Sequence, residues 1–143
     1  MGVRRQAREC ALQILYHLDG AAEAAPLVDD AVERFFANFD APERARALTH
    51  EIVRGVVKHR PEVDEIISKN SPRWKLERMA MVDRNVLRLC IHELMFEPST
   101  PARVVIDEGI EIARRFGGDQ SPAFVNGVLD AAARQLDRLG AAR

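Results

Sequence analysis

The sequence predicts an all-α protein of about seven helices. Apolar residues recur at three- and four-residue spacing along nearly the whole chain, which is the pattern of helices with one buried face. The 143 residues, 47% of them hydrophobic, are enough for one domain with a single buried core. No segment shows a convincing strand pattern. We therefore expect one helical domain that spans residues 1–143.

The first three helices follow from this spacing. The first extends from the N-terminal arginines to Leu18 and ends at Gly20, since glycine is common directly after a helix. The second spans residues 27–39, with phenylalanines on its core face. Asp40 and Glu43 resemble a capping box ahead of the third helix.

A short fourth helix opens at Pro61 and ends at residues 70–72, where Asn, Ser and Pro follow one another. This break is the best candidate boundary between two halves of the chain. We therefore expect sub-bundles of residues 1–70 and 71–143 within the single domain.

The second half contains the central helix. Residues 82–96 are apolar around most of the helix circumference, as is typical of a buried helix. A sixth helix follows Pro101 and ends at the glycine pair 117–118, and Ser121 begins the seventh. Glycines inside the helices predict close helix crossings at three positions: Gly55, Gly109 and Gly127.

Charge is unevenly distributed along the chain, although the formal net charge is only -1. Residues 19–43 are acidic apart from Arg34, whereas residues 73–88 are mainly basic. The cations of the basic stretch are Arg73, Lys75, Arg78, Arg84 and Arg88. A binding site for nucleic acid must therefore be a local patch, because the protein as a whole is not basic.

The first helix begins with Arg4, Arg5 and Arg8, where the helix dipole disfavours each cation by roughly 0.3–1 kcal/mol. Helical spacing places Arg5, Leu12 and Tyr16 on one stripe beside the core face, with the other two arginines near its edge. Guanidinium groups beside an exposed phenol predict contacts with phosphates and an unpaired base. A solvated helix terminus without a specific role is the alternative interpretation.

A second candidate surface is the polar loop at residues 117–121, which enters the last helix. Free amides at a helix start can receive a phosphate, and Phe124 lies early in that helix. Spacing alone slightly favours Phe124 as a core residue. If Phe124 and Tyr16 meet in space, their rings and the first-helix arginines would form a platform for single-stranded RNA.

The sequence offers little for catalysis. Two His-Glu pairs begin like the zinc-protease motif, but Arg54 and Phe96 occupy the positions of the required second histidine. Without a nucleophile turn, a phosphate-binding loop or paired carboxylates, we expect no enzyme, no cofactor and no metal. Cys10 and Cys90 are expected to be buried, reduced thiols of a cytoplasmic protein, and no segment predicts a membrane span.

Four stretches of the chain carry a family resemblance: residues 4–16 (RRQARECALQILY), 83–94 (DRNVLRLCIHEL), 106–117 (IDEGIEIARRFG) and 123–130 (AFVNGVLD). In this order they resemble the NusB family of transcription antitermination factors from end to end. The similarity is weakest at residues 20–42 and 69–75.

The resemblance implies two packed helical bundles that form one compact domain. It also implies a factor that binds boxA-type single-stranded leader RNA together with NusE, a small-subunit ribosomal protein. With other Nus factors, the pair would join RNA polymerase and sustain ribosomal RNA transcription. The oligomeric state stays open between a monomer and a homodimer.

The resemblance also assigns roles to particular residues. Arg4, Arg5 and Arg8 would contact phosphates, Tyr16 and Phe124 would meet bases, and Arg88 would support the same face. Three further residues would lie near the RNA or the partner: Asp83, Asp119 and Gln120. Ala123 is a departure, because many relatives carry a basic residue there. One missing cation predicts weaker binding of RNA alone and a greater dependence on the partner.

Two alternative functions remain. One is the RNA-binding domain of the type fused to ribosomal RNA cytosine methyltransferases, and the other is a protein-docking helical module that binds no RNA. Because the chain ends at Arg143 with no catalytic domain attached, we expect the free-standing factor.

Overall fold

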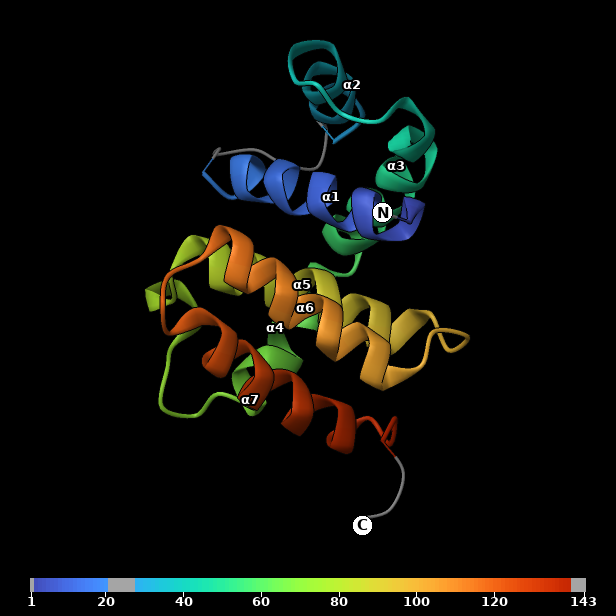
Figure 1. Cartoon of the computed structure of the whole chain (residues 1–143). Coiled ribbons are helices and arrows are strands. Elements are labelled where there is room, and N and C mark those ends of the chain that lie inside the picture. Colours follow the sequence, from blue (N-terminus) through green and yellow to red (C-terminus); the bar gives the residue numbers. More distant parts are fainter. Residues whose placement is uncertain (1, 21–27, 140–143) are drawn as a thin grey trace. The chain divides into compact units, whose positions relative to one another are not determined.

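The computed structural model describes residues 2–20 and 28–139, and every regular element within these ranges is helical (Figure 1). The α-helices are α1 (Val3–Asp19), α2 (Val28–Asn38), α3 (Arg46–Lys58), α4 (Arg60–Lys69), α5 (Met81–Phe96), α6 (Ala102–Phe116) and α7 (Ser121–Gln135). Two short 3-10 turns, η2 (Glu43–Ala45) and η3 (Leu76–Arg78), precede α3 and α5. The predicted all-α class with seven helices is confirmed for these residues. Leu27, expected at the start of the second helix, lies outside them.

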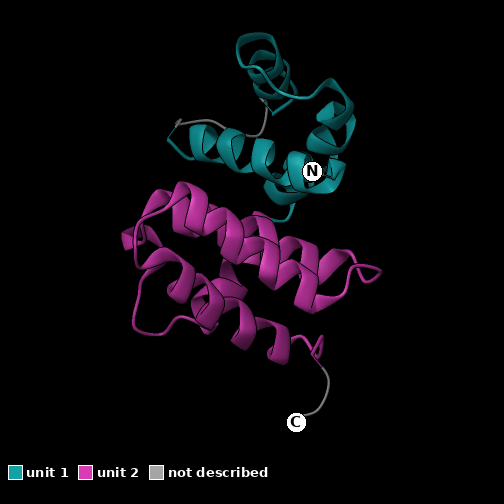
Figure 2. Ribbon diagram, viewed as in Figure 1, with its two compact units in different colours: residues 1–59 teal, residues 60–143 magenta. Residues whose placement is uncertain are grey.

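The chain divides into two compact units, residues 1–59 and residues 60–143 (Figure 2). The boundary lies at the start of α4, ahead of the break expected at residues 70–72. α4 packs against α5 and buries Val63, Ile66 and Ile67, so it belongs to unit 2.

In unit 1, α3 packs against both α1 and α2. Small residues on α1 and α3 are completely buried, with Ala7, Ala11, Thr49 and Val53 at 0% exposure. The distance between packed helices depends on side-chain size, so small residues permit a close approach. The buried hydroxyl of Thr49 donates a hydrogen bond to the carbonyl oxygen of Ala45 at 2.7 Å, which satisfies it inside the core.

Both cysteines are buried, as expected, Cys10 on α1 and Cys90 on α5. Burial raises the pKa of the Cys10 thiol, and the carboxylate of Glu9 raises it further, whereas a hydrogen bond with Thr49 opposes the shift. The Cys10 thiol is therefore protonated and weakly reactive at neutral pH.

α2 ends in an aromatic cluster. The rings of Phe35 and Phe36 are buried and meet edge to face, with centroids 5.6 Å apart. Phe39 stacks on Phe35 at 4.9 Å but is 61% exposed. The expectation that all three pack in the core is confirmed for Phe35 and Phe36. It is wrong for Phe39, which lies just beyond the last residue of the helix.

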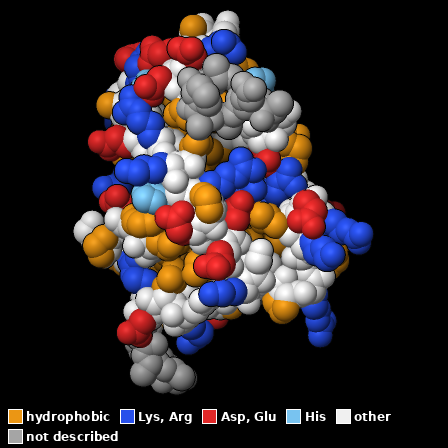
Figure 3. All heavy atoms as spheres, turned by 180° about the vertical axis from the view of Figure 1, so that it is seen from behind, with side chains coloured by type: hydrophobic (Ala, Val, Ile, Leu, Met, Phe, Trp, Pro, Cys, Tyr) orange, Lys and Arg blue, Asp and Glu red, His pale blue; other side chains and the backbone are white. Residues whose placement is uncertain are grey.

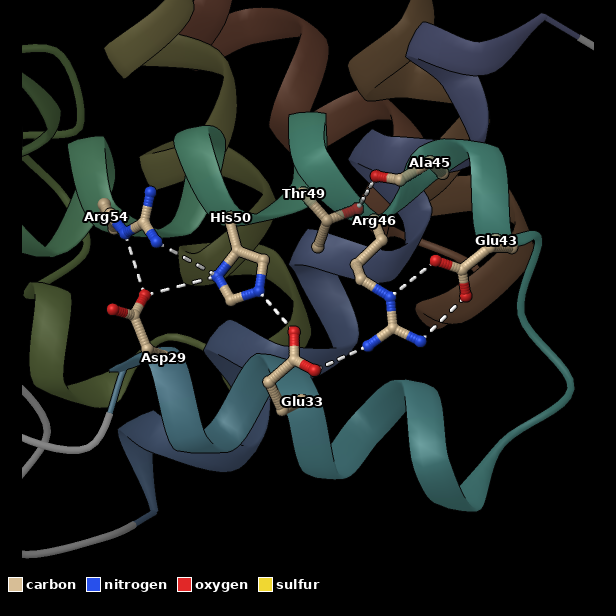
Figure 4. A network of polar contacts seen from close by, with 8 residues as sticks. All are labelled: Asp29, Glu33, Glu43, Ala45, Arg46, Thr49, His50 and Arg54. Atoms are coloured by element: carbon tan, nitrogen blue, oxygen red, sulfur yellow. Dashed lines mark hydrogen bonds and ion pairs between the residues drawn. The ribbon is translucent and has the colours of Figure 1, made fainter.

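Polar side chains also join α2 to α3 (Figure 4). The His50 ring lies between two carboxylates of α2, with Nδ1 3.2 Å from Asp29 and Nε2 2.7 Å from Glu33. Arg54 donates from Nε to the same Asp29 oxygen at 2.8 Å. The hydrogen bond from Arg54, with a smaller effect from His50, lowers the pKa of Asp29.

Arg46 extends this network towards η2. Its guanidinium donates to Glu33 at 2.7 Å and to both carboxylate oxygens of Glu43, and it also lies over the Phe36 ring. The capping box expected from Asp40 and Glu43 is wrong, because no side chain caps η2 or α3 and Glu43 is bound to Arg46 instead. We call this network the α2–α3 clasp; it consists of Asp29, Glu33, Glu43, Arg46, His50 and Arg54.

In unit 2, α5 packs against α4, α6 and α7. Every side chain from Asn85 to Ile91 is buried, so the helix is enclosed around its circumference over two turns. This confirms the prediction drawn from its nearly continuous apolar sequence. A helix in this position needs partners for its polar side chains as well as apolar neighbours.

The close crossing predicted at Gly109 is present. A Cβ atom at Gly109 would lie 2.8 Å from Cδ1 of Leu129 on α7 and 2.9 Å from Sγ of Cys90 on α5, too close for a real side chain. The same prediction is wrong for Gly127, which is exposed and has nothing within 4 Å of a Cβ. For Gly55 it stays a prediction.

The chain after α7 returns to the turn between α5 and α6. Asp137 has a left-handed backbone, with φ at 58°, and the guanidinium of the next residue, Arg138, donates to the carbonyl oxygens of Leu94 and Thr100. This arginine therefore satisfies backbone groups at both ends of the turn.

The surface carries charges of both signs. On the face that Figure 3 shows, basic and acidic side chains lie among one another and among apolar patches. None of the helices in the described part of the chain has the length and apolar character that a membrane crossing requires.

Candidate nucleic-acid interface

The first turn of α1 presents two exposed arginines, Arg4 and Arg5. No acidic residue lies in this turn, and Gly2, which precedes it, provides no side-chain cap. Cations at the positive end of a helix dipole are disfavoured, and an anion bound at this turn would relieve that cost.

Arg8 does not share this exposure. The sequence analysis placed it off the core face, but its side chain is 4% exposed. The reason is the width of the buried face of α1, which also includes Leu12 and Leu15, one and two turns further along the helix. The expectation that Arg8 lies off the core face is therefore wrong. Leu12, on the stripe of Arg5 and Tyr16, is also buried, at 1% exposure.

Tyr16 is 45% exposed near the C-terminal end of α1. It follows Arg5 by eleven residues, and positions at this spacing differ by only about 20° around an α-helix. The exposed phenol and the exposed guanidinium therefore lie along the same face of α1, as the spacing predicted.

Arg88 lies in the interior of unit 2, at 4% exposure. Its Nε donates to Oδ1 of Asp64 on α4 at 2.9 Å, and its Nη2 donates to Oδ2 at 3.2 Å. A further contact joins it to the side-chain oxygen of Asn85 at 3.3 Å. A planar guanidinium held by both carboxylate oxygens joins α4 to α5, and this arrangement does not favour direct contact with an external phosphate.

The loop between α6 and α7 uses part of its own amides in internal hydrogen bonds. The Gly118 amide donates to Oγ of Ser121 at 3.1 Å, and the Ser121 amide donates back to the Gly118 carbonyl at 3.1 Å. Pro122 has no N–H. The expectation that free amides at this helix start receive a phosphate stays a prediction for the remaining amides, and Asp119 and Gln120 are exposed.

Phe124 lies in the first turn of α7 and is partly exposed. The sequence left open whether it is a core residue or an exposed ring, and its exposure is intermediate between the two. Its ring meets the indole of Trp74 edge to face, with centroids 6.3 Å apart and planes at 83°. Tyr16 belongs to unit 1 and Phe124 to unit 2, so the expected meeting of their rings stays a prediction.

Trp74 is the residue that the sequence analysis missed. It is 58% exposed and is the only tryptophan of the chain. The signal was present, because it stands directly between Arg73 and Lys75, and an aromatic residue flanked by cations is typical of nucleic-acid contacts.

Asp83, in the first turn of α5, has one buried carboxylate oxygen, Oδ1, that lacks a hydrogen-bond partner among the residues described. A buried acceptor without a donor is costly, so Oδ1 is suited to accept a hydrogen bond from a bound molecule. Metal binding has no comparable support, because the described residues contain no cluster of three or more His, Cys, Asp or Glu side chains that could hold an ion.

Comparison with known proteins gives one consistent result. The NusB family model matches residues 5–134. The chain is 50% identical over 134 residues to the transcription antitermination protein NusB of Anaeromyxobacter dehalogenans, which covers 93% of this chain and 92% of that protein. It is 46% identical over 139 residues to NusB of Sorangium cellulosum, which covers 97% of each.

Solved structures agree with the sequence comparison. T. maritima NusB has a TM-score of 0.75 and 34% identity, over 92% of this chain and 91% of that one. A crystal structure of the antitermination factors NusB and NusE in complex with double-stranded RNA gives a TM-score of 0.78 at 30% identity. The match covers 94% of this chain and 98% of that one. Since sequence and helical fold match over nearly the full length of these proteins, the chain belongs to the NusB family.

Proposed function

We propose that this chain is a cytoplasmic transcription antitermination factor that binds boxA-type single-stranded leader RNA together with NusE. The proposal includes its assembly with other Nus factors on RNA polymerase. The protein acts by binding and catalyses no reaction.

The observation that carries the proposal is the exposed face of α1. Arg4 and Arg5 provide cations at a helix terminus without acidic neighbours in its first turn, and Tyr16 provides an exposed ring along the same face as Arg5. Cations can bind the phosphates of RNA, and an exposed ring can stack on an unstacked base. Relatives named as antitermination proteins, and a similar solved structure that holds both NusE and RNA, support the same assignment.

The proposed contacts differ in kind. Arg4 and Arg5 bind phosphates, and Tyr16 and Phe124 meet bases. Arg8 and Arg88, both buried, act on RNA binding by holding α1 and α5 in place. Asp83, with its unpartnered oxygen, and the exposed Asp119 and Gln120 belong to the RNA or NusE surface.

The test is the fluorescence anisotropy of a labelled boxA-type RNA titrated with the protein, with and without NusE, at two salt concentrations. We expect selective binding over a scrambled RNA and a lower Kd when NusE is present. Arg5→Ala is expected to weaken binding and to reduce the salt dependence by the contribution of about one phosphate contact.

Arg34→Ala, which removes an exposed arginine of α2 in the same unit, is the matched control and should leave the Kd unchanged. Equal binding to both RNAs, or none even with NusE, would contradict the proposal and favour a protein-docking module.

A further inference from the structure

The segment between α4 and α5 presents three cations around an exposed indole. Arg73, Trp74, Lys75 and Arg78 are all exposed within residues 70–80. Among the residues that the structure describes, the three cationic side chains make neither an ion pair nor a hydrogen bond, in contrast to the arginines of the α2–α3 clasp. Unpaired cations at this density favour a multivalent anion.

The backbone of this segment is held in place from within unit 2. Asn70 donates to the carbonyl oxygen of Ile66 at 2.9 Å and to the side chain of Gln135 on α7 at 2.5 Å. Ser71, 5% exposed, donates to the carbonyl oxygen of Ile67 at 2.7 Å, and the Trp74 amide donates to Ser71 at 3.0 Å. The indole is therefore presented by an ordered turn, so that little conformational entropy is lost on binding.

The Trp74 ring is supported but not covered. Its edge-to-face contact with Phe124 occupies at most one face of the indole, and 58% of the residue is exposed. A free indole face beside guanidinium and ammonium groups suits a nucleobase with its adjacent phosphates, since every base offers a π-face for stacking. Bases in a duplex are already stacked on one another, so the surface fits a single strand better than a double helix.

We propose that residues 73–78, together with Phe124, form a binding site for one unstacked base of single-stranded RNA. Trp74 stacks on the base, and Arg73, Lys75 and Arg78 bind the phosphates on either side of it. The proposal rests on the RNA-binding function proposed above, and it adds a site in unit 2 that is separate in sequence from the contacts on α1.

Trp74 is the only tryptophan in the chain, so the intrinsic indole fluorescence of the protein reports on this residue alone. The full-length protein is titrated with an unlabelled boxA-type oligonucleotide while indole fluorescence is followed, and a labelled oligonucleotide is followed by anisotropy in parallel. We expect the indole fluorescence to be quenched with the same midpoint as the anisotropy change.

Variants separate stacking from charge. Trp74→Ala should raise the Kd about 5- to 100-fold, the range expected for the loss of one base–aromatic stack, whereas Trp74→Phe should keep most of the affinity. Arg73→Gln and Lys75→Gln should each reduce the slope of log Kd against log salt concentration by about 0.7. Arg103→Gln, at an exposed arginine of α6 that pairs with Asp130, is the control. It should change neither the Kd nor the slope of log Kd against log salt concentration.

Three results would overturn the site. An anisotropy change without quenching, combined with an unchanged Kd for Trp74→Ala, would leave RNA binding intact and place it elsewhere. Quenching by NusE alone and not by RNA would identify the segment as a protein contact. No RNA binding by any measure, with or without NusE, would remove both this site and the proposed function. Far-ultraviolet circular dichroism and the Tm of each variant show that the fold is retained.

Discussion

In unit 1, α2 is joined to α3 by a clasp whose acidic side chains remain largely exposed. In unit 2, α5 packs against α4, α6 and α7 and buries the guanidinium of its ion pair. An exposed ion pair contributes about 0–1 kcal/mol, because water and salt screen it. A buried leucine contributes several times more. The buried cores should therefore respond to lost volume, whereas the α2–α3 clasp should respond to pH and salt.

The largest expected effect is the loss of a leucine from the centre of unit 2. Leu89→Ala should lower the free energy of unfolding by about 2–5 kcal/mol, because the cavity left by a side chain only 2% exposed cannot collapse fully. Leu15→Ala on α1 should fall in the same range. Urea denaturation measures both values, and wild-type stability in either variant would show that the assigned core is wrong.

Removing the buried guanidinium of unit 2 should have the next largest effect. Arg88→Met leaves the Asp64 carboxylate without its main partner and should cost about 2–3 kcal/mol. The cost falls below that of a fully buried pair because Asp64 remains 21% exposed and Arg60 lies 3.6 Å away. In the double variant with Asp64→Leu, most of this loss should be recovered. A double variant as unstable as the single one would mean that Arg88 acts through packing alone.

A pair of glycine substitutions distinguishes crowded from open helix positions. Gly109→Ala should destabilise unit 2 by about 1–2 kcal/mol, because the new methyl group collides with Leu129 and Cys90. Gly127→Ala should stabilise the protein by about 0.5–1 kcal/mol, since alanine favours the helix and nothing lies near its Cβ. Thermal unfolding of the two variants checks the opposite signs, and a shift in the same direction would contradict the crossing geometry.

The smallest expected effect is an acid-induced loosening of the α2–α3 clasp. Arg54 holds the pKa of Asp29 below its usual value of 3.8, and His50 holds that of Glu33 below 4.5. The stability from these carboxylates is fully present above their unfolded-state pKa values and is lost as pH falls through the lower folded values.

Backbone amide signals of α2 in a two-dimensional NMR spectrum should therefore change as the pH falls below the usual pKa values of these carboxyl groups, before the signals of α5 change. Glu33→Gln should remove part of this response. Simultaneous loss of the α2 and α5 signals would show that the clasp does not act as a separate element.

The sequence predicted the helices well because their signal is local. Three- and four-residue spacing marks the buried face of α1, and the nearly complete apolar circumference of residues 82–96 marks α5 as the enclosed helix. The same spacing misplaced Arg8, since a pattern of apolar residues cannot show that an arginine shares the buried face.

Features that depend on distant residues were not predictable in the same way. The partner of Arg88 is Asp64, on another helix, and no local pattern joins them. Likewise, Trp74 is notable in the sequence only as a lone aromatic residue between two cations, and its contact with Phe124 needs the fold of unit 2. Of the candidate site, the exposure of Arg4, Arg5 and Tyr16 followed from the sequence, whereas the buried roles of Arg8 and Arg88 did not.

The hydrogen bonds of Arg138 bear on the order in which the chain can fold as it is synthesised. All residues of unit 1 precede Arg60, so this unit has its whole sequence available while the rest is still being translated. The turn between α5 and α6 is different, because the donor for its Leu94 and Thr100 carbonyl oxygens arrives only with residue 138. On the ribosome, this turn of unit 2 is therefore completed only after residue 138 has been added, well after the turn itself has been made.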